Sequence, residues 1–137
     1  MVHSIKISCS KSSLKDVREF AEKVLANYEI SDVDKNLIVV ALDEVCANII
    51  IHSHQCDEKD HITVQIREEE NILEFSIIDQ GETFNISEYT VPSLDALIKD
   101  KKAGGIGLIL VKKIMDQIKI EKQDGFNVCR MYKSLIF

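Results

Sequence analysis

A carboxylate and an amide four residues apart, Glu44 and Asn48, form the first pair of side chains that could do chemistry. On a helix, residues four apart lie on the same face, one turn above the other. An amide oxygen suits a hard cation such as Mg²⁺, which takes few protein ligands and adds phosphate oxygens. A neighbouring carboxylate could accept the proton of a hydroxyl nucleophile. The more common interpretation of an isolated E-x-x-x-N is a hydrogen-bonded pair at the edge of the core, so both interpretations stay open here.

A second candidate is Asp79-Gln80-Gly81, which follows an alternating apolar stretch. A carboxylate is an acceptor that could hold the amino group of an adenine. The glycine would let a ligand approach the backbone closely. On its own, this tripeptide is more often a turn that ends a strand.

The third candidate is the run Gly104-Gly105-Ile106-Gly107, which stands directly before an apolar helical pattern. Backbone N–H groups at a helix N-terminus, together with the positive end of the helix dipole, form a site for an anion such as phosphate. The run lacks the G-K-[ST] of a Walker A motif and the spacing of the G-x-G-x-x-G dinucleotide fingerprint. A hinge and a phosphate-binding turn are therefore equally good interpretations of the run alone.

Three helices are expected to position these groups. Ser12 or Ser13 could cap the first, which ends near Leu25, and Ser31 with Asp32 opens the second, which is predicted from about Val33 to His54. The second helix is apolar almost all round, which is typical of a buried helix. Its apolar residues are Leu37, Ile38, Ala41, Leu42, Val45, Ile49 and Ile51. The third helix opens at the glycines and is expected to bury Leu110, Val111, Ile114 and Ile118.

Five strands are predicted from alternating apolar residues. They lie around 5–7, 62–66, 73–79, 118–122 and 126–132. Two polar turns, 68–71 and 123–125, make hairpins of the middle and last pairs. The segment 81–103 has no regular pattern, and loops of this length are often lids or binding loops. The order predicts one α+β domain over residues 1–137, a two-layer sandwich in which three helices cover one face of a mixed, mostly antiparallel sheet.

Composition narrows the function classes. Lys and Arg number 17 and Asp and Glu 23, giving a net charge of −6, which argues against a nucleic-acid binder. No apolar run is long enough to span a membrane, and no signal peptide is visible. The four cysteines make no CxxC pair, so we expect a reduced, cytoplasmic protein. His52, His54 and Cys56 resemble a metal cluster, but residues two apart on a helix point apart, so a polar helix end is favoured.

Taken in order, the three motifs resemble the N, G1 and G2 boxes of the ATPase superfamily that includes gyrase B, heat-shock chaperones, histidine kinases and MutL. The boxes are Glu44-Val45-Cys46-Ala47-Asn48, Asp79-Gln80-Gly81-Glu82-Thr83-Phe84 and Gly104-Gly105-Ile106-Gly107-Leu108. The stretch 41–52, the D-x-G-x-x-F form of the second box and the chain length are similar to the anti-sigma-factor serine kinases of bacterial partner-switching systems. The resemblance covers the chain from about residue 10 to its end.

The resemblance implies a Bergerat-type ATP-binding sandwich with the segment 81–103 as its lid. Asn48 would coordinate Mg²⁺, and Glu44 would be the general base. The nucleotide would be held by the second and third boxes, with Asp79 on the adenine amino group, Gly81 and Phe84 at the base pocket, and Gly104, Gly105, Ile106, Gly107 and Leu108 around the phosphates. Where the family usually carries a Thr near the adenine, this sequence has Asn127, which could replace that contact.

By the same resemblance, the protein would phosphorylate a Ser or Thr on an anti-anti-sigma antagonist and sequester a sigma factor when that antagonist is unavailable. Members of the family are commonly homodimers, and some single-domain relatives serve phosphatase or sensor cascades. The alternative is a nucleotide-gated binding module that sequesters a partner and never transfers phosphate. Glu44 favours the kinase, because pure binding needs Asn48, Asp79 and the glycines but no base.

Overall fold

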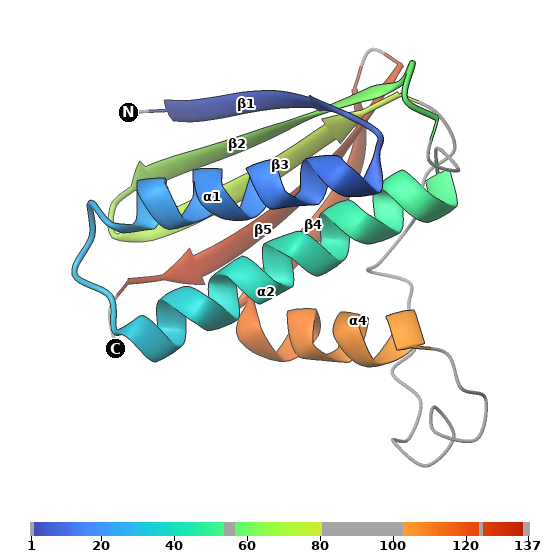
Figure 1. Cartoon of the computed structure of the whole chain (residues 1–137). Helices are drawn as coiled ribbons and strands as arrows, with labels where there is room; N and C mark the ends of the chain where they lie inside the picture. Colours follow the sequence, from blue (N-terminus) through green and yellow to red (C-terminus); the bar gives the residue numbers. More distant parts are fainter. Residues whose placement is uncertain (1, 54–56, 81–102, 124, 136–137) are drawn as a thin grey trace.

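Five strands and three α-helices form two layers (Figure 1). The computed structural model describes residues 2–53, 57–80, 103–123 and 125–135. The elements, in chain order, are β1 (Val2–Ser8), a 3₁₀ turn (Lys11–Ser13), α1 (Leu14–Leu25), α2 (Asp32–Asn48), a π-helical segment (Ile49–Ser53), β2 (His61–Glu69), β3 (Ile72–Asp79), α4 (Ala103–Ile114), β4 (Gln117–Gln123) and β5 (Phe126–Ser134). Among the described residues, no helix is long and apolar enough to cross a membrane. The predicted lid, 81–103, lies outside the described residues except for its last residue.

The sheet has the strand order β1-β2-β3-β5-β4. All four pairings are antiparallel, so the predicted fold class is confirmed, without the parallel pair that a mixed sheet would contain. Glu70 and Asn71 form the two-residue turn between β2 and β3, and their positive φ angles of 51° and 64° match a hairpin turn of type I′. Gly125, with φ +83°, turns the chain from β4 into β5. Both predicted hairpins are present.

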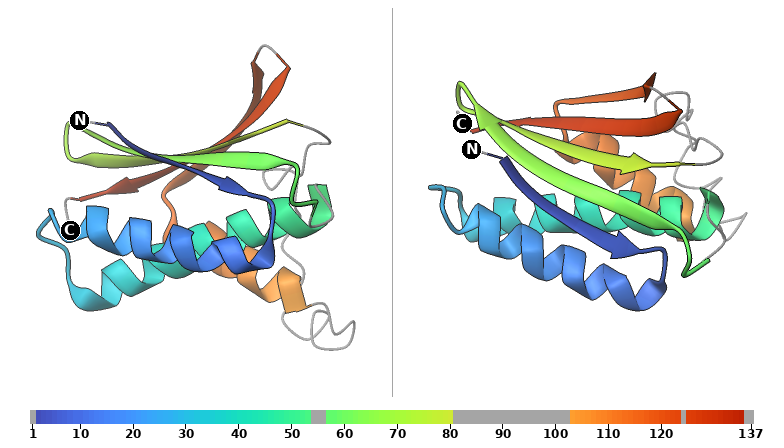
Figure 2. Two further views of the ribbon diagram at one scale, coloured as in Figure 1. Left: turned by 45° about the horizontal axis from the view of Figure 1, so that its top comes forward. Right: turned by 90° about the horizontal axis from the view of Figure 1, so that it is seen from above.

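The helices cover one face of the sheet, with α2 lying between α1 and α4 (Figures 1 and 2). The core lies between the two layers. Strand alternation builds its sheet side, where Val64 and Ile66 of β2 and Phe75 and Ile77 of β3 are fully buried. Burying one such side chain contributes about 1.5–3 kcal/mol.

The start of α2 matches the sequence, and its end does not. Ser31 accepts a hydrogen bond from the backbone N–H of Asp34 at 3.1 Å, as an N-cap does. The α-helix then ends at Asn48, and five residues of π-helix replace the predicted last turns. Ile49 and Ile50, which are adjacent in sequence, are both buried there. Such wide turns are frequent at functional sites.

The prediction that α2 is buried all round is wrong for its outward face. Leu37 is 41% exposed, and Val33 and Val40 are 69% and 44% exposed. Leu110 of α4, another predicted core residue, is 41% exposed. The physical reason is that the sheet covers α2 on one side and α1 and α4 flank it, so these apolar side chains face away from the core.

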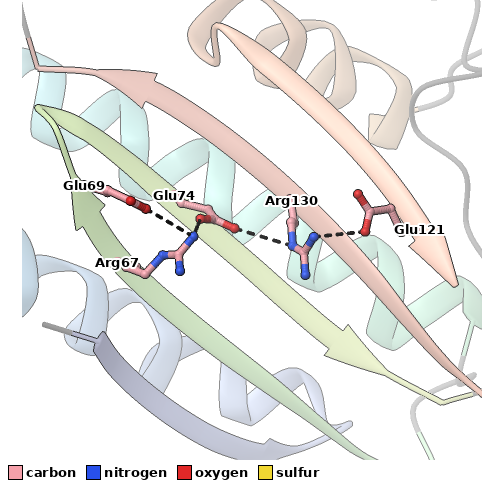
Figure 3. Close-up of polar contacts among 5 residues, drawn as sticks. All are labelled: Arg67, Glu69, Glu74, Glu121 and Arg130. Carbon is pink, nitrogen blue, oxygen red and sulfur yellow. Dashed lines mark hydrogen bonds and ion pairs between the residues drawn. The ribbon is translucent and has the colours of Figure 1, made fainter. Parts of the chain in front are cut away.

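The other face of the sheet carries a ladder of alternating charges, shown in Figure 3 in front of the strands. Arg67 of β2 contacts Glu74 of β3 and lies 3.7 Å from Glu69. The Arg130 side chain of β5 reaches Glu74 at 3.4 Å and Glu121 of β4 at 2.9 Å. These pairs cross four strands, so Arg67 and Arg130 are both paired with carboxylates within the molecule.

Candidate functional site

The Glu44–Asn48 pair lies in the last turns of α2. The Asn48 side-chain N–H donates to the main-chain oxygen of Glu44 at 2.7 Å, and Asn48 is only 5% exposed. Since the amide nitrogen is held by this bond, the amide oxygen is directed away from that carbonyl. The spacing of four residues therefore does put both groups on one face of the helix, as predicted.

Glu44 is half-buried, and this changes its acidity. Partial burial raises the pKa of the Glu44 carboxyl, and the negative charge of Asp43 raises it further. Asp43 itself is held by Arg18 of α1 at 2.9 Å, an interaction that no motif in the sequence indicated. A carboxylate with a raised pKa is a better proton acceptor once it is ionised.

Asp79 and Asn127 lie side by side in the sheet. They are register partners on β3 and β5, and they are 5% and 4% exposed. Opposite residues of antiparallel strands point to the same face, and here that is the face covered by the helices. The structure therefore brings together the strand-end carboxylate and the amide that were expected to contact an adenine.

The glycine run lies at the start of α4. The helix begins at Ala103, so the run 104–107 occupies its first turns, as predicted. The start of α4, the end of α2 and the end of β3 lie on the same side of the molecule in Figure 1. The side chains of Ile106 and Leu108 are outside the described part of the chain, as are Gly81 and Phe84 altogether.

Two buried thiols lie close to this site. Cys46 of α2 is fully buried and Cys129 of β5 is 6% exposed. Burial, with the charge of Asp79 adding to it, raises the pKa of the Cys129 thiol to about 12. Burial also raises the pKa of Cys46. Both are therefore neutral packing groups at physiological pH.

A hollow of about 250 Å³ opens beside Asp79 and Gln80. Its walls include Lys6, Thr63 and Ile78. These three residues share the sheet face that carries the charge ladder, since Lys6 pairs with Thr63 and Thr63 with Ile78. The hollow thus lies across the sheet from the helix-covered face that holds the Asp79 and Asn127 side chains.

The residues at the site fit a magnesium nucleotide. The Asn48 amide supplies an oxygen donor, which Mg²⁺ prefers, and the Glu44 carboxylate lies on the same face of α2. Among the described residues, no group of three or more His, Cys, Asp or Glu side chains could hold a metal ion. The donor set suits a cation that takes most of its ligands from phosphate and water. The backbone N–H groups in the first turn of α4 could bind the phosphates of the nucleotide.

A sequence model described as the histidine kinase-like ATPase domain matches residues 7–133. The serine-protein kinase RsbW of Bacillus licheniformis is 26% identical over 105 residues, which span 74% of this chain and 64% of that relative. RsbW of Halalkalibacterium halodurans is 27% identical over 123 residues, or 85% of this chain and 74% of the relative. The chain thus spans less than two thirds of the first of these relatives.

Two solved structures have a similar fold. The crystal structure of the RsbU and RsbW domains of a Mycobacterium tuberculosis protein has a TM-score of 0.68 at 18% identity, and it covers 98% of this chain and 32% of that one. The SiaB–SiaC complex from Pseudomonas aeruginosa has a TM-score of 0.64 at 15% identity, covering 95% of this chain and 88% of that one. At these identities the likeness establishes the fold.

Proposed function

Because the chain belongs to the family of histidine kinase-like ATPase domains, we propose that it is an ATP-dependent serine/threonine protein kinase and anti-sigma factor of a bacterial partner-switching system. The observation that carries the proposal is the coupled pair on α2, a half-buried Glu44 beside a buried, hydrogen-bonded Asn48. The similarity to proteins named serine-protein kinase RsbW supports the same function.

The nucleotide would lie between the helical layer and the ends of β3 and β5. Asp79 accepts a hydrogen bond from the adenine amino group, with Asn127 beside it. The backbone N–H groups at the start of α4 hold the phosphates. Asn48 holds Mg²⁺, which when bound neutralises charge on the phosphate oxygens.

Phosphoryl transfer then needs a hydroxyl and a base. The Ser or Thr oxygen of the protein substrate forms a bond to the γ-phosphorus, while the bond from that phosphorus to the β–γ bridging oxygen breaks and ADP leaves. Glu44 accepts the hydroxyl proton. The raised pKa of Glu44 suits this role, because a carboxylate that is less acidic takes the proton more readily.

The protein substrate is proposed to be an anti-anti-sigma antagonist. When that antagonist is phosphorylated or absent, the kinase would bind a sigma factor, which places the switch in the cytoplasm. Two similarities support a protein partner: SiaB, a neighbour in fold, was crystallised with a second protein, SiaC, and the relatives named RsbW are serine-protein kinases, which act on proteins. We also propose that the chain acts as a homodimer.

The test is phosphorylation of the candidate antagonist encoded beside this protein, with labelled ATP and Mg²⁺. We expect wild type to label the antagonist on Ser or Thr. Glu44→Gln keeps the shape but removes the base, so transfer should slow by about 10²–10⁴-fold. In calorimetry Glu44→Gln should bind Mg·ATP nearly as well as wild type, whereas Asn48→Ala should bind much more weakly.

Three results would contradict the proposal in different ways. If wild type binds Mg·ATP normally but does not label the antagonist, the protein is a nucleotide-gated binding module and not a kinase. If Glu44→Gln labels the antagonist at the wild-type rate, the protein is a kinase but Glu44 is not its general base. Equal and weak binding heats for wild type and Asn48→Ala would show that the protein does not bind Mg·ATP through Asn48.

A further inference from the structure

The outward face of α2 is apolar where a surface helix is normally polar. Val33, Leu37 and Val40 are spaced by four and three residues, which puts them on one face of the helix. All three are exposed, by 69%, 41% and 44%. Single exposed apolar residues are ordinary, but three in line on one helix form a patch, and such patches mark interaction sites.

The patch continues toward the site. Glu44 follows Val40 by four residues, so its side chain lies on the same stripe. From Val33 to Glu44 the stripe measures about 16 Å along the helix, at 1.5 Å per residue. Exposed Leu110 belongs to α4, which packs beside α2. The apolar surface and the proposed base therefore share one helix face.

On the opposite face of the sheet, the exposed apolar residues Val2, Ile72 and Phe126 lie on three different strands and not in line along one element. There the charge ladder of Figure 3 pairs each arginine with carboxylates of the same sheet. Charges that are already paired gain little from a partner, because the partner would have to replace those contacts. The helical layer is the side on which a partner gains most by burying apolar surface.

We propose that the outward face of α2 docks the protein substrate, through an amphipathic helix of that substrate that brings its Ser or Thr to Glu44. This inference rests on the proposed kinase function. A hydroxyl must come within about 2.6–3.2 Å of its base, so the protein that carries it must cover the adjoining turns of α2. A second copy of the chain bound on the same stripe would instead block Glu44.

Negative charge lies at the Val33 end of the stripe, and it indicates which charge the docking helix should carry. Asp32 and Asp34 stand on either side of Val33 in the first turn of α2. The docking helix should therefore carry apolar residues at spacings of three and four, with a basic residue near the end that meets Val33. Its phosphorylated residue should lie at the other end, about three turns away.

The test is a steady-state assay of the double variant Leu37→Gln/Val40→Gln with the antagonist encoded beside this protein. Glutamine is a good helix former, so α2 should stay folded. We expect the KM for the antagonist to rise about tenfold or more, since central apolar contacts dominate such interfaces. The kcat and the Kd for Mg·ATP should stay within about twofold of wild type. Val2→Gln, at a 55% exposed residue of β1, is the matched control and should change none of the three constants.

The possible failures are distinguishable. If wild type phosphorylates the antagonist and the double variant has an unchanged KM, the docking inference is wrong and the kinase stands. If the double variant turns a dimer into a monomer in sedimentation, the face is an interface between copies and the inference is overturned. If wild type does not phosphorylate the antagonist, the proposed function fails and the inference falls with it. Unchanged circular dichroism and normal Mg·ATP binding by the double variant would separate lost docking from lost folding.

Discussion

Glu44 is held in a position that suits its proposed reaction better than it suits folding. A carboxylate loses favourable hydration when it is partly buried, and this residue also has Asp43 beside it. Arg18 pairs with Asp43 and not with Glu44 in the described contacts. Among the described residues, no cationic side chain forms an ion pair with the Glu44 carboxylate. The carboxylate can therefore accept a proton without first breaking such a pair.

This placement predicts a pH-dependent gain of stability in Glu44→Gln. The folded pKa is raised, so folding favours the protonated carboxyl; that contribution is present below the unfolded pKa and is lost as pH rises through the folded pKa. At pH 7 the variant should be more stable than wild type, and the difference should fade as pH falls toward the ordinary value of 4.5. Urea unfolding at both pH values measures this. A variant less stable at pH 7 would show that the carboxylate makes a stabilising contact.

At the scale of elements, α4 begins with residues that disfavour a helix. Glycine costs about 1 kcal/mol relative to alanine within a helix, and three glycines stand in the first five residues of α4. The third helix was nevertheless predicted at this place, because Val111 and Ile114 give it a buried side. The glycines make sense if a ligand must approach the backbone of these turns.

The variant Gly105→Ala tests this trade between stability and binding. Alanine is the better helix former, so the free energy of unfolding should rise by up to about 1 kcal/mol. If the phosphates approach the backbone here, the added methyl group should also weaken the binding of Mg·ATP. Denaturation without nucleotide and calorimetry with nucleotide measure the two effects separately. Unchanged nucleotide affinity would show that Gly105 is not needed at the phosphates.

At the scale of the whole molecule, apolar periodicity was enough to predict the layers. Alternating apolar residues and the polar turns at 68–71 and 123–125 predicted the hairpins. The candidate residues Glu44 and Asn48 lie on α2, and Asp79 and Asn127 are register partners on β3 and β5. Hydrophobicity could not show which side of α2 is exposed, because its buried and its exposed faces both carry apolar residues. The charge ladder could not be predicted from the sequence either, since it depends on the cross-strand register of β2, β3, β5 and β4.

That ladder predicts a stability effect that leaves function intact. The Glu74 side chain is 13% exposed and contacts both Arg67 and Arg130, so it joins two strands to its own. Glu74→Gln keeps the shape but makes the hydrogen bond from Arg67 neutral and removes the ion pair with Arg130, which should lower the free energy of unfolding by about 1 kcal/mol. Because the ladder lies across the sheet from the helices, Mg·ATP binding and phosphoryl transfer should not change.

Glu19→Gln, which loses only a 4.0 Å pair with an exposed lysine, is the control and should unfold like wild type. Equal stability of both variants in urea would mean that the ladder contributes nothing, and a loss of nucleotide binding by Glu74→Gln would show that the two faces of the sheet are coupled.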